Sequence, residues 1–124
     1  MATTAEPWNL ETLGAPRVRQ GWVHGTAGRA ADGCRVDCWL SPGHGGIHAA
    51  RFEVFAGPEA MAAAAWLAVW LAGQSIPAAQ AVTGLWLAET VGMPDETRSE
   101  GLCIEDALRS ALTAMAADGG GNGI

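Results

Sequence analysis

The stretch that decides the fold is CRVDCWLSPGHGGIHAARFEVF, residues 34–55. Its first part alternates in character, and the residues that fall on its more apolar face are Cys34, Val36, Cys38 and Leu40. This period of two predicts a β-strand. The proline and glycines of SPGHGG predict a turn, and IHAARFEVF is again typical of a strand. The two runs therefore predict an antiparallel β-hairpin.

Helical patterns follow the hairpin. The run PEAMAAAAWLAVWLAG opens with proline and glutamate and stops at Gly73, as helices often do. It is apolar on nearly all sides, which predicts a helix central to the core. The run from Pro77 to Gly92 predicts a second helix, although Gly84 weakens the pattern.

A third helix is predicted over CIEDALRSALTAMAA, residues 103–117. Glu105 and Asp106 are expected in its first turn, where carboxylates complement the positive end of the helix dipole. Residues 1–30 are interrupted by prolines and glycines and are expected to be irregular. Because strands come first and helices second, the order of elements predicts an α+β fold.

Length and charge restrict the class of protein. The chain has 124 residues, and we expect one domain over residues 1–118 followed by a flexible glycine-rich tail at 119–124. The net charge is −6 and all basic residues are arginine, which argues against a nucleic-acid partner. No segment is predicted to span a membrane. The absence of a leader-like pattern and the odd number of cysteines favour the cytoplasm.

The cysteines of the predicted strand differ in their expected roles. Cys34 and Cys38 point the same way, but four residues at about 3.3 Å each put them roughly 13 Å apart. This separation is too large for a disulfide or a shared metal ion. Cys38 is expected in the core, whereas Cys34, which follows the AADG loop, is the candidate for thiol chemistry. The histidines are scattered and are expected on the surface: His24, His44 and His48.

Four stretches together resemble a known family. They are GAPR, AGRAADG, GIHAARFEVFAGPEAMAAAAWLAVWLAG and LCIEDALRSAL, and they lie between about Ala15 and about Ala114. The sequence resembles the iron–sulfur cluster scaffolds, namely the IscU proteins and the N-terminal domain of NifU. The resemblance implies a small antiparallel sheet of about three strands covered by helices. It also implies a protein that binds partners, such as a cysteine desulfurase or other assembly proteins, rather than an enzyme.

Family scaffolds bind a [2Fe–2S] cluster through three cysteines helped by an aspartate or a histidine. The resemblance implies that most of these ligands are replaced here. In the order of the family's Cys-Gly-Asp motif, second cysteine and His-Cys pair, the matching residues are Asp32, Gly33, Cys34, Gly57, Ser99 and Glu100.

A three-cysteine [2Fe–2S] site on one chain is therefore not expected. The resemblance leaves Asp32, Cys34 and Glu100 as candidate metal ligands. Either these residues hold a single iron or zinc ion, or they are solvated residues of a vestigial site. With or without the metal ion, the resemblance implies a divergent, scaffold-like protein with an accessory or regulatory role in iron–sulfur metabolism.

A second and shorter resemblance is to the SufE-type sulfur acceptors. It is carried by GCRVDCW, with Gly33, Cys34 and Trp39, and by RSEGL at 98–102. It implies that Cys34 accepts a persulfide sulfur from a cysteine desulfurase, and that Arg98 lowers the pKa of this thiol. A third interpretation is an interaction module that kept only the fold.

Overall fold

The computed structural model describes residues 12–122, with the side chains of residues 12–117. Three antiparallel strands form one sheet in the order β1-β2-β3. Their bounds are β1 Val23–Arg29, β2 Cys34–Gly43 and β3 Gly46–Phe55. The helices are α1 Pro58–Leu71, α2 Ile76–Gln80, α3 Gly84–Val91 and α4 Arg98–Asn122, with short 3-10 turns η3 Ala30–Asp32 and η4 Asp95–Thr97.

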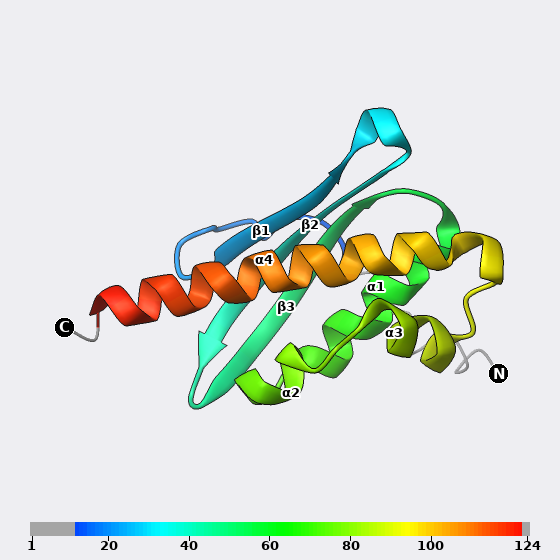
Figure 1. The fold of residues 1–124 in the computed structure, drawn as a ribbon. Coiled ribbons are helices and arrows are strands. Elements are labelled where there is room, and N and C mark those ends of the chain that lie inside the picture. The colour runs from blue at the N-terminus through cyan, green and yellow to red at the C-terminus, as the bar shows by residue number, and fades with distance from the viewer. Residues whose placement is uncertain (1–11, 123–124) are drawn as a thin grey trace, which may run out of the picture.

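The helices cover one face of the sheet. In Figure 1, α4 runs as a long helix across the strands, and α1 lies beside β3 with α2 and α3 following it. Helix α4 packs on β1 and β2, whereas α1 packs on β3 and α3 packs on α4. The predicted α+β fold, with a three-stranded antiparallel sheet covered by helices, is confirmed.

The predicted hairpin is confirmed as β2 and β3. Cys38 pairs with Phe52, and both side chains are fully buried under the helices together with Val36 and Leu40. The register shifts between Ser41 and Pro42, where proline has no amide hydrogen for the ladder. The alternation of apolar residues along β2 therefore marks the inner face of the sheet.

Strand β1 lies inside the region predicted to be irregular, so that expectation was wrong for residues 23–29. The glycines that obscured the pattern have a tertiary role. A Cβ on Gly25 would lie 2.1 Å from the amide nitrogen of Ala111 in α4. Glycine is needed here because the backbone of α4 packs directly against β1.

The outer face of the sheet carries a polar cluster. The imidazole of His24 lies 2.7 Å from Asp37 Oδ1 and stacks on Trp39 with ring centroids 4.7 Å apart. Arg19 lies over the same indole, which leaves Trp39 only 5% exposed. Burial alone would raise the pKa of Asp37, but hydrogen bonds from His24, Arg35 and Thr26 outweigh burial and lower this pKa.

The helix predicted over residues 77–92 is two helices. The side chain of Thr83 accepts a hydrogen bond from the amide of Trp86 and caps α3, so the chain turns between α2 and α3. Gly84, which weakened the predicted pattern, packs against Gly101 of α4. A Cβ on Gly84 would lie 2.8 Å from the Gly101 backbone. A single helix was predicted because the sequence does not show this contact.

Helix α1 confirms the prediction of a buried helix, since seven of its residues are buried. It has 14 residues. Over the part of the chain that the structure describes, no helix is both long enough and apolar enough to cross a membrane.

Helix α4 extends beyond its predicted bounds of 103–117 at both ends, because it runs from Arg98 to Asn122. Its last residues fall within the predicted tail at 119–124, of which 123–124 lie outside the described residues. The division into one domain and a flexible tail stays a prediction.

Glu105 and Asp106 are not in the first turn of α4, as was predicted, because the helix begins seven residues before Glu105. Glu105 instead accepts a 2.7 Å hydrogen bond from the amide of Gly84 at the start of α3 and pairs with Arg109 at 2.7 Å. Burial would raise the pKa of Glu105, but the Gly84 amide and Arg109 outweigh it and lower this pKa. Glu105 therefore ties α3 to α4.

Candidate functional site

The candidate site lies at the end of the sheet where the β1–β2 connection meets the start of α4. Gly28 and Gly33 have positive φ values of 79° and 90°, which glycine adopts without strain. They flank η3 and bring the chain back so that Cys34, the first residue of β2, pairs with Arg29 at the end of β1. This turn places Cys34 at the end of the strand rather than in its middle.

A second thiol, from α4, lies against Cys34. The Cys103 S–H donates to the carbonyl oxygens of Ala27 and Cys34, each 3.7 Å from Sγ. The Cys103 thiol is also close enough to the Cys34 thiol to raise the pKa of Cys34. Both cysteines are half-buried and neither is in a disulfide. The structure therefore contains a pair of thiols at this end of the fold.

The pair keeps Cys34 protonated. Burial raises the pKa of Cys34 to about 12, and the hydrogen bond and charge of Cys103 and the charge of Glu100 add to this effect. The expected partner Arg98 instead has its Nε 3.2 Å from Asp95 Oδ1. The sulfur-acceptor interpretation requires a thiolate with a lowered pKa, so the raised pKa of Cys34 weighs against it.

Of the candidate metal ligands, Glu100 lies close to Cys34, whereas Asp32 is paired with Arg29. Asp32 is exposed and lies 3.4 Å from Arg29 Nε. Glu100 is close enough to Cys34 to raise its pKa, and one buried Glu100 oxygen, Oε1, has no hydrogen-bond partner. Within the described part of the chain, no group of three or more histidine, cysteine, aspartate or glutamate residues is placed to hold a metal ion. The single-ion site at Asp32, Cys34 and Glu100 stays a prediction.

Sequence reasoning missed Cys103. The sequence held a signal for it, because Cys103 follows Glu100 by three residues and the two side chains lie on the same side of a helix. The predicted helix began at Cys103, and this start separated Cys103 from Glu100. The partner of Cys103 is 69 residues away, and no local pattern connects the two.

Cys38 is part of the core, as predicted. Its side chain is fully buried, and burial raises the pKa of its thiol well above the usual range. Cys38 is four residues further along β2 than Cys34, which corresponds to roughly 13 Å. Cys34 and Cys103 are therefore the two thiols available at the candidate site.

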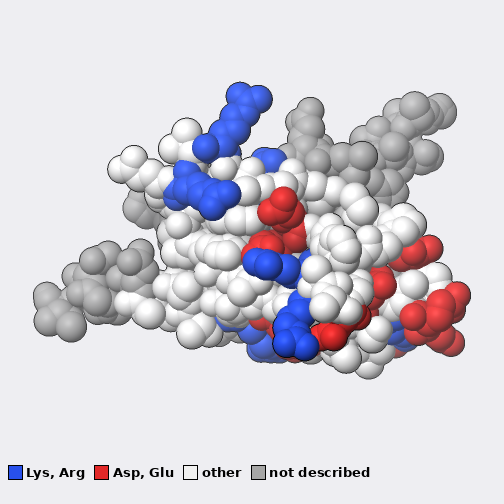
Figure 2. Space-filling view, turned by 90° about the horizontal axis from the view of Figure 1, so that it is seen from above, with Lys and Arg blue, Asp and Glu red and all other residues white. Residues whose placement is uncertain are grey.

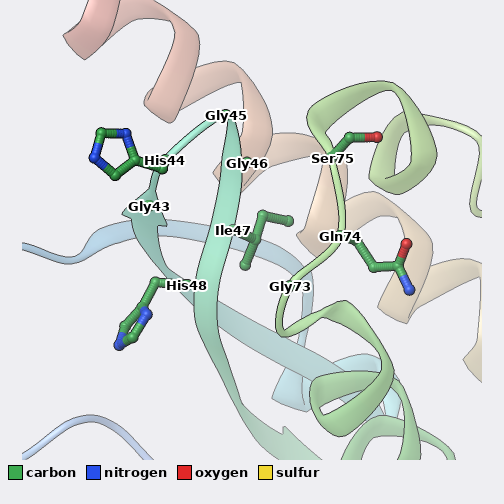
Figure 3. A pocket seen from close by; sticks show the side chains of 9 residues that line it. All are labelled: Gly43, His44, Gly45, Gly46, Ile47, His48, Gly73, Gln74 and Ser75. Carbon is green, nitrogen blue, oxygen red and sulfur yellow. The ribbon is translucent and has the colours of Figure 1, made fainter.

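A cleft of about 320 Å³ lies at the other end of β2. Figure 3 shows it between the β2–β3 turn and the segment Gly73–Ser75, with His44 and His48 projecting from the hairpin away from Gln74. Gly43, at this end of β2, is nine residues from Cys34, which corresponds to about 30 Å. The turn histidines therefore cannot join the thiols in one metal site.

Three tryptophans form an aromatic surface on the helical side. Trp70 and Trp86 have ring centroids 5.1 Å apart, and Trp66 packs against both. Trp70 and Trp86 line an apolar cleft of about 360 Å³.

On the face in Figure 2, arginine side chains are separated by uncharged and acidic ones, so the visible charges do not form a basic stripe.

The comparisons with known proteins identify the family. The model of the NifU-like N terminal domain matches residues 6–118, which is a longer range than the resembling stretches suggested. A search of curated proteins found no match. Because the family model covers almost all of the sequence and the fold is a three-stranded antiparallel sheet covered by helices, the chain belongs to the NifU-like N-terminal domains, a family of iron–sulfur cluster assembly scaffolds.

Proposed function

We propose that this protein serves iron–sulfur cluster assembly in the cytoplasm as an accessory or regulatory relative of the scaffolds. It acts by binding assembly proteins, among them a cysteine desulfurase, rather than by catalysis. It does not carry a [2Fe–2S] cluster on three cysteines of one chain.

The supply of thiols at the candidate site supports this proposal. A [2Fe–2S] cluster requires four ligands, and the family uses three thiolates. Cys38 is fully buried and points into the core, so it does not contribute. The family resemblance implies that Asp32, Gly57 and Glu100 take the three cysteine positions and Cys34 the aspartate position, and Gly57 has no side chain. The donors at this end do not fit the cluster.

Anaerobic reconstitution with ferrous iron and sulfide tests the proposal. We expect the wild-type monomer to bind less than a stoichiometric amount of cluster and to lack the visible thiolate-to-iron charge-transfer bands. The matched control is a ligand-restored variant that combines Asp32→Cys, Gly57→Cys and Glu100→Cys with Cys34→Asp. We expect this variant to gain a cluster.

Gly57 tolerates this substitution. Its φ is −76°, which any residue adopts, and an added Cβ would meet only Glu59 Oε1 at 3.6 Å. At position 57 the substitution therefore tests the ligand and not the fold. A stable [2Fe–2S] unit on the wild-type monomer would contradict the proposal.

The single-ion prediction is checked on the same samples. Metal analysis after incubation with Fe²⁺ or Zn²⁺ gives the number of ions bound per chain. If Asp32, Cys34 and Glu100 hold one ion, then Asp32→Ala and Glu100→Ala each lower this number. Equal binding by the wild type and both variants would eliminate the single-ion site.

A further inference from the structure

We propose that Cys34 and Cys103 close reversibly to an intramolecular disulfide, which makes this end of the fold sensitive to thiol oxidants. This inference goes beyond the proposed function and does not depend on it. It concerns a pair of residues of which one, Cys103, is not at a ligand position implied by the family resemblance.

The geometry of the two thiols carries the inference. They come from different elements, β2 and α4, and Cys103 Sγ lies 3.7 Å from the carbonyl oxygen of Cys34, across a sequence separation of 69 residues. A disulfide requires the sulfur atoms to approach to about 2.05 Å, so side-chain rotation must close the remaining gap. Both residues are half-buried rather than fully buried, so a small reagent can reach them.

Gly28 makes the close approach possible. A Cβ at this position would lie 2.8 Å from Cys103 Sγ and 2.2 Å from the carbonyl oxygen of Cys34. Gly28 also has a positive φ of 79°, a conformation that other residues rarely adopt. The absence of a side chain at Gly28 therefore lets the thiol from α4 lie against the end of β2.

The chemistry needs an oxidant, and a low-molecular-weight disulfide RSSR supplies it. One thiol loses its proton and its thiolate attacks a sulfur of RSSR, which breaks the S–S bond and releases RS⁻. The second thiol then loses its proton and attacks the protein sulfur of this mixed disulfide, which releases another RS⁻. Each RS⁻ takes up one proton, so the two cysteines give two electrons and two protons and RSSR becomes two RSH.

Closure changes what the site offers. The reduced form presents two thiols at this end of the sheet, and the oxidised form presents neither of them. Because Cys38 is fully buried, it does not replace them. Oxidation therefore removes the described chain's accessible thiols while it fixes the start of α4 to the start of β2.

The test uses the folded full-length chain, oxidised glutathione as the probe, and no iron or sulfide. We expect free thiols, counted after denaturation, to fall from three to one per chain. Proteolytic mapping should then link the peptide of Cys34 to that of Cys103, and the intact mass should fall by that of two hydrogen atoms. Closure within one chain should proceed at the same rate when the protein is diluted.

Matched variants separate this pair from its neighbours. Cys38→Ala should still form the link, whereas Cys34→Ser and Cys103→Ser should retain a glutathione adduct on the remaining thiol. Gly28→Ala should slow closure, because the added methyl group crowds both the Cys34 carbonyl oxygen and Cys103 Sγ.

Two results on the wild type would overturn the inference. One is a stable glutathione adduct on Cys34 or Cys103 while the other thiol stays free, and the other is a disulfide between two chains. Mapping of the wild type decides the question even if a serine variant fails to fold. Because the assay contains no iron, its failure leaves the proposed function unaffected, and failure of cluster assays leaves this inference unaffected.

Discussion

Cys34 and Cys38 lie on the same strand and the same face, and their surroundings differ completely. Cys34 is at the end of β2, half-buried, with the thiol of Cys103 beside it. Cys38 is in the middle of β2, fully buried and paired with Phe52 of β3. The comparison teaches that strand alternation fixes which way a side chain points. The elements packed above it decide whether it belongs to a core or to a site.

The two positions also differ in what they contribute. At Cys38 the sulfur is an apolar volume that the surrounding side chains require. At Cys34 the sulfur has a partner with the same chemistry, so its loss affects reactivity more than stability. Substitutions on and around β2 should therefore lower the free energy of unfolding by several kcal/mol in the core and by almost nothing at the candidate site.

The largest effect is expected for Phe52→Ala, opposite Cys38. Phe52 is fully buried, and truncation of a buried phenylalanine costs about 3–5 kcal/mol in the free energy of unfolding. Urea denaturation followed by circular dichroism measures this loss. A cost below about 1 kcal/mol would mean that the core at Cys38 is loosely packed, and the contrast with Cys34 would then fail.

The comparison is tested directly by the same substitution at both cysteines. Cys38→Ser places a hydroxyl in an apolar core, which should cost about 1–3 kcal/mol. Cys34→Ser should cost less than about 1 kcal/mol because this position is half-exposed and retains polar neighbours. Parallel denaturation curves measure both values, and equal costs would show that the two positions do not differ.

A smaller, pH-dependent effect is expected on the outer face at Asp37. The pKa of Asp37 is lower in the folded chain than in the unfolded chain, so this carboxylate stabilises the fold above the unfolded pKa of about 4. The contribution is lost as pH falls through the folded pKa. Asp37→Asn should cost about 1 kcal/mol at pH 7 and weaken the acid sensitivity. Thermal melts of the wild type and the variant from pH 7 to pH 3 measure this difference in stability. Identical pH profiles for the two proteins would contradict this role of Asp37.

The smallest effect on stability, less than about 1 kcal/mol, is expected for Cys103→Ala. Its effect on reactivity should be clear. Loss of the Cys103 hydrogen bond and charge lowers the pKa of Cys34, so Cys34 should react faster with iodoacetamide at pH 8. In the wild type, the rate should rise about tenfold per pH unit between pH 7 and pH 9, because the pKa is about 12. An early plateau would contradict the raised pKa.

Local patterns predicted the parts of the fold that depend on local order. The hairpin of β2 and β3 was predicted because alternation and a proline-glycine turn occur together in one stretch, and α1 because its apolar residues are continuous. Strand β1 was not predicted, since Gly25 is required by the backbone of α4, 86 residues later at Ala111. The start of α3 likewise depends on a distant contact, since Gly84 packs against the backbone of Gly101 in α4.

The candidate site was predicted in part. The sequence placed Cys38 in the core, which its full burial confirms. It singled out Cys34 as the candidate for thiol chemistry, and this residue is half-buried in the structure. It gave no indication of Cys103 as a partner, because only the folded chain brings α4 to the end of β2. It also assigned Arg98 to Cys34, whereas η4 places Asp95 beside Arg98.

The conformation of Gly28 has a consequence for the history of this chain. A side chain at position 28 would crowd Cys103 Sγ at 2.8 Å and the Cys34 carbonyl oxygen at 2.2 Å, so glycine at position 28 favours the contact between Cys103 and β2. Relatives in which position 28 is larger should therefore lack a cysteine at position 103, and relatives with both cysteines should keep the glycine. An alignment of close homologues would show this covariation as a paired gain or loss.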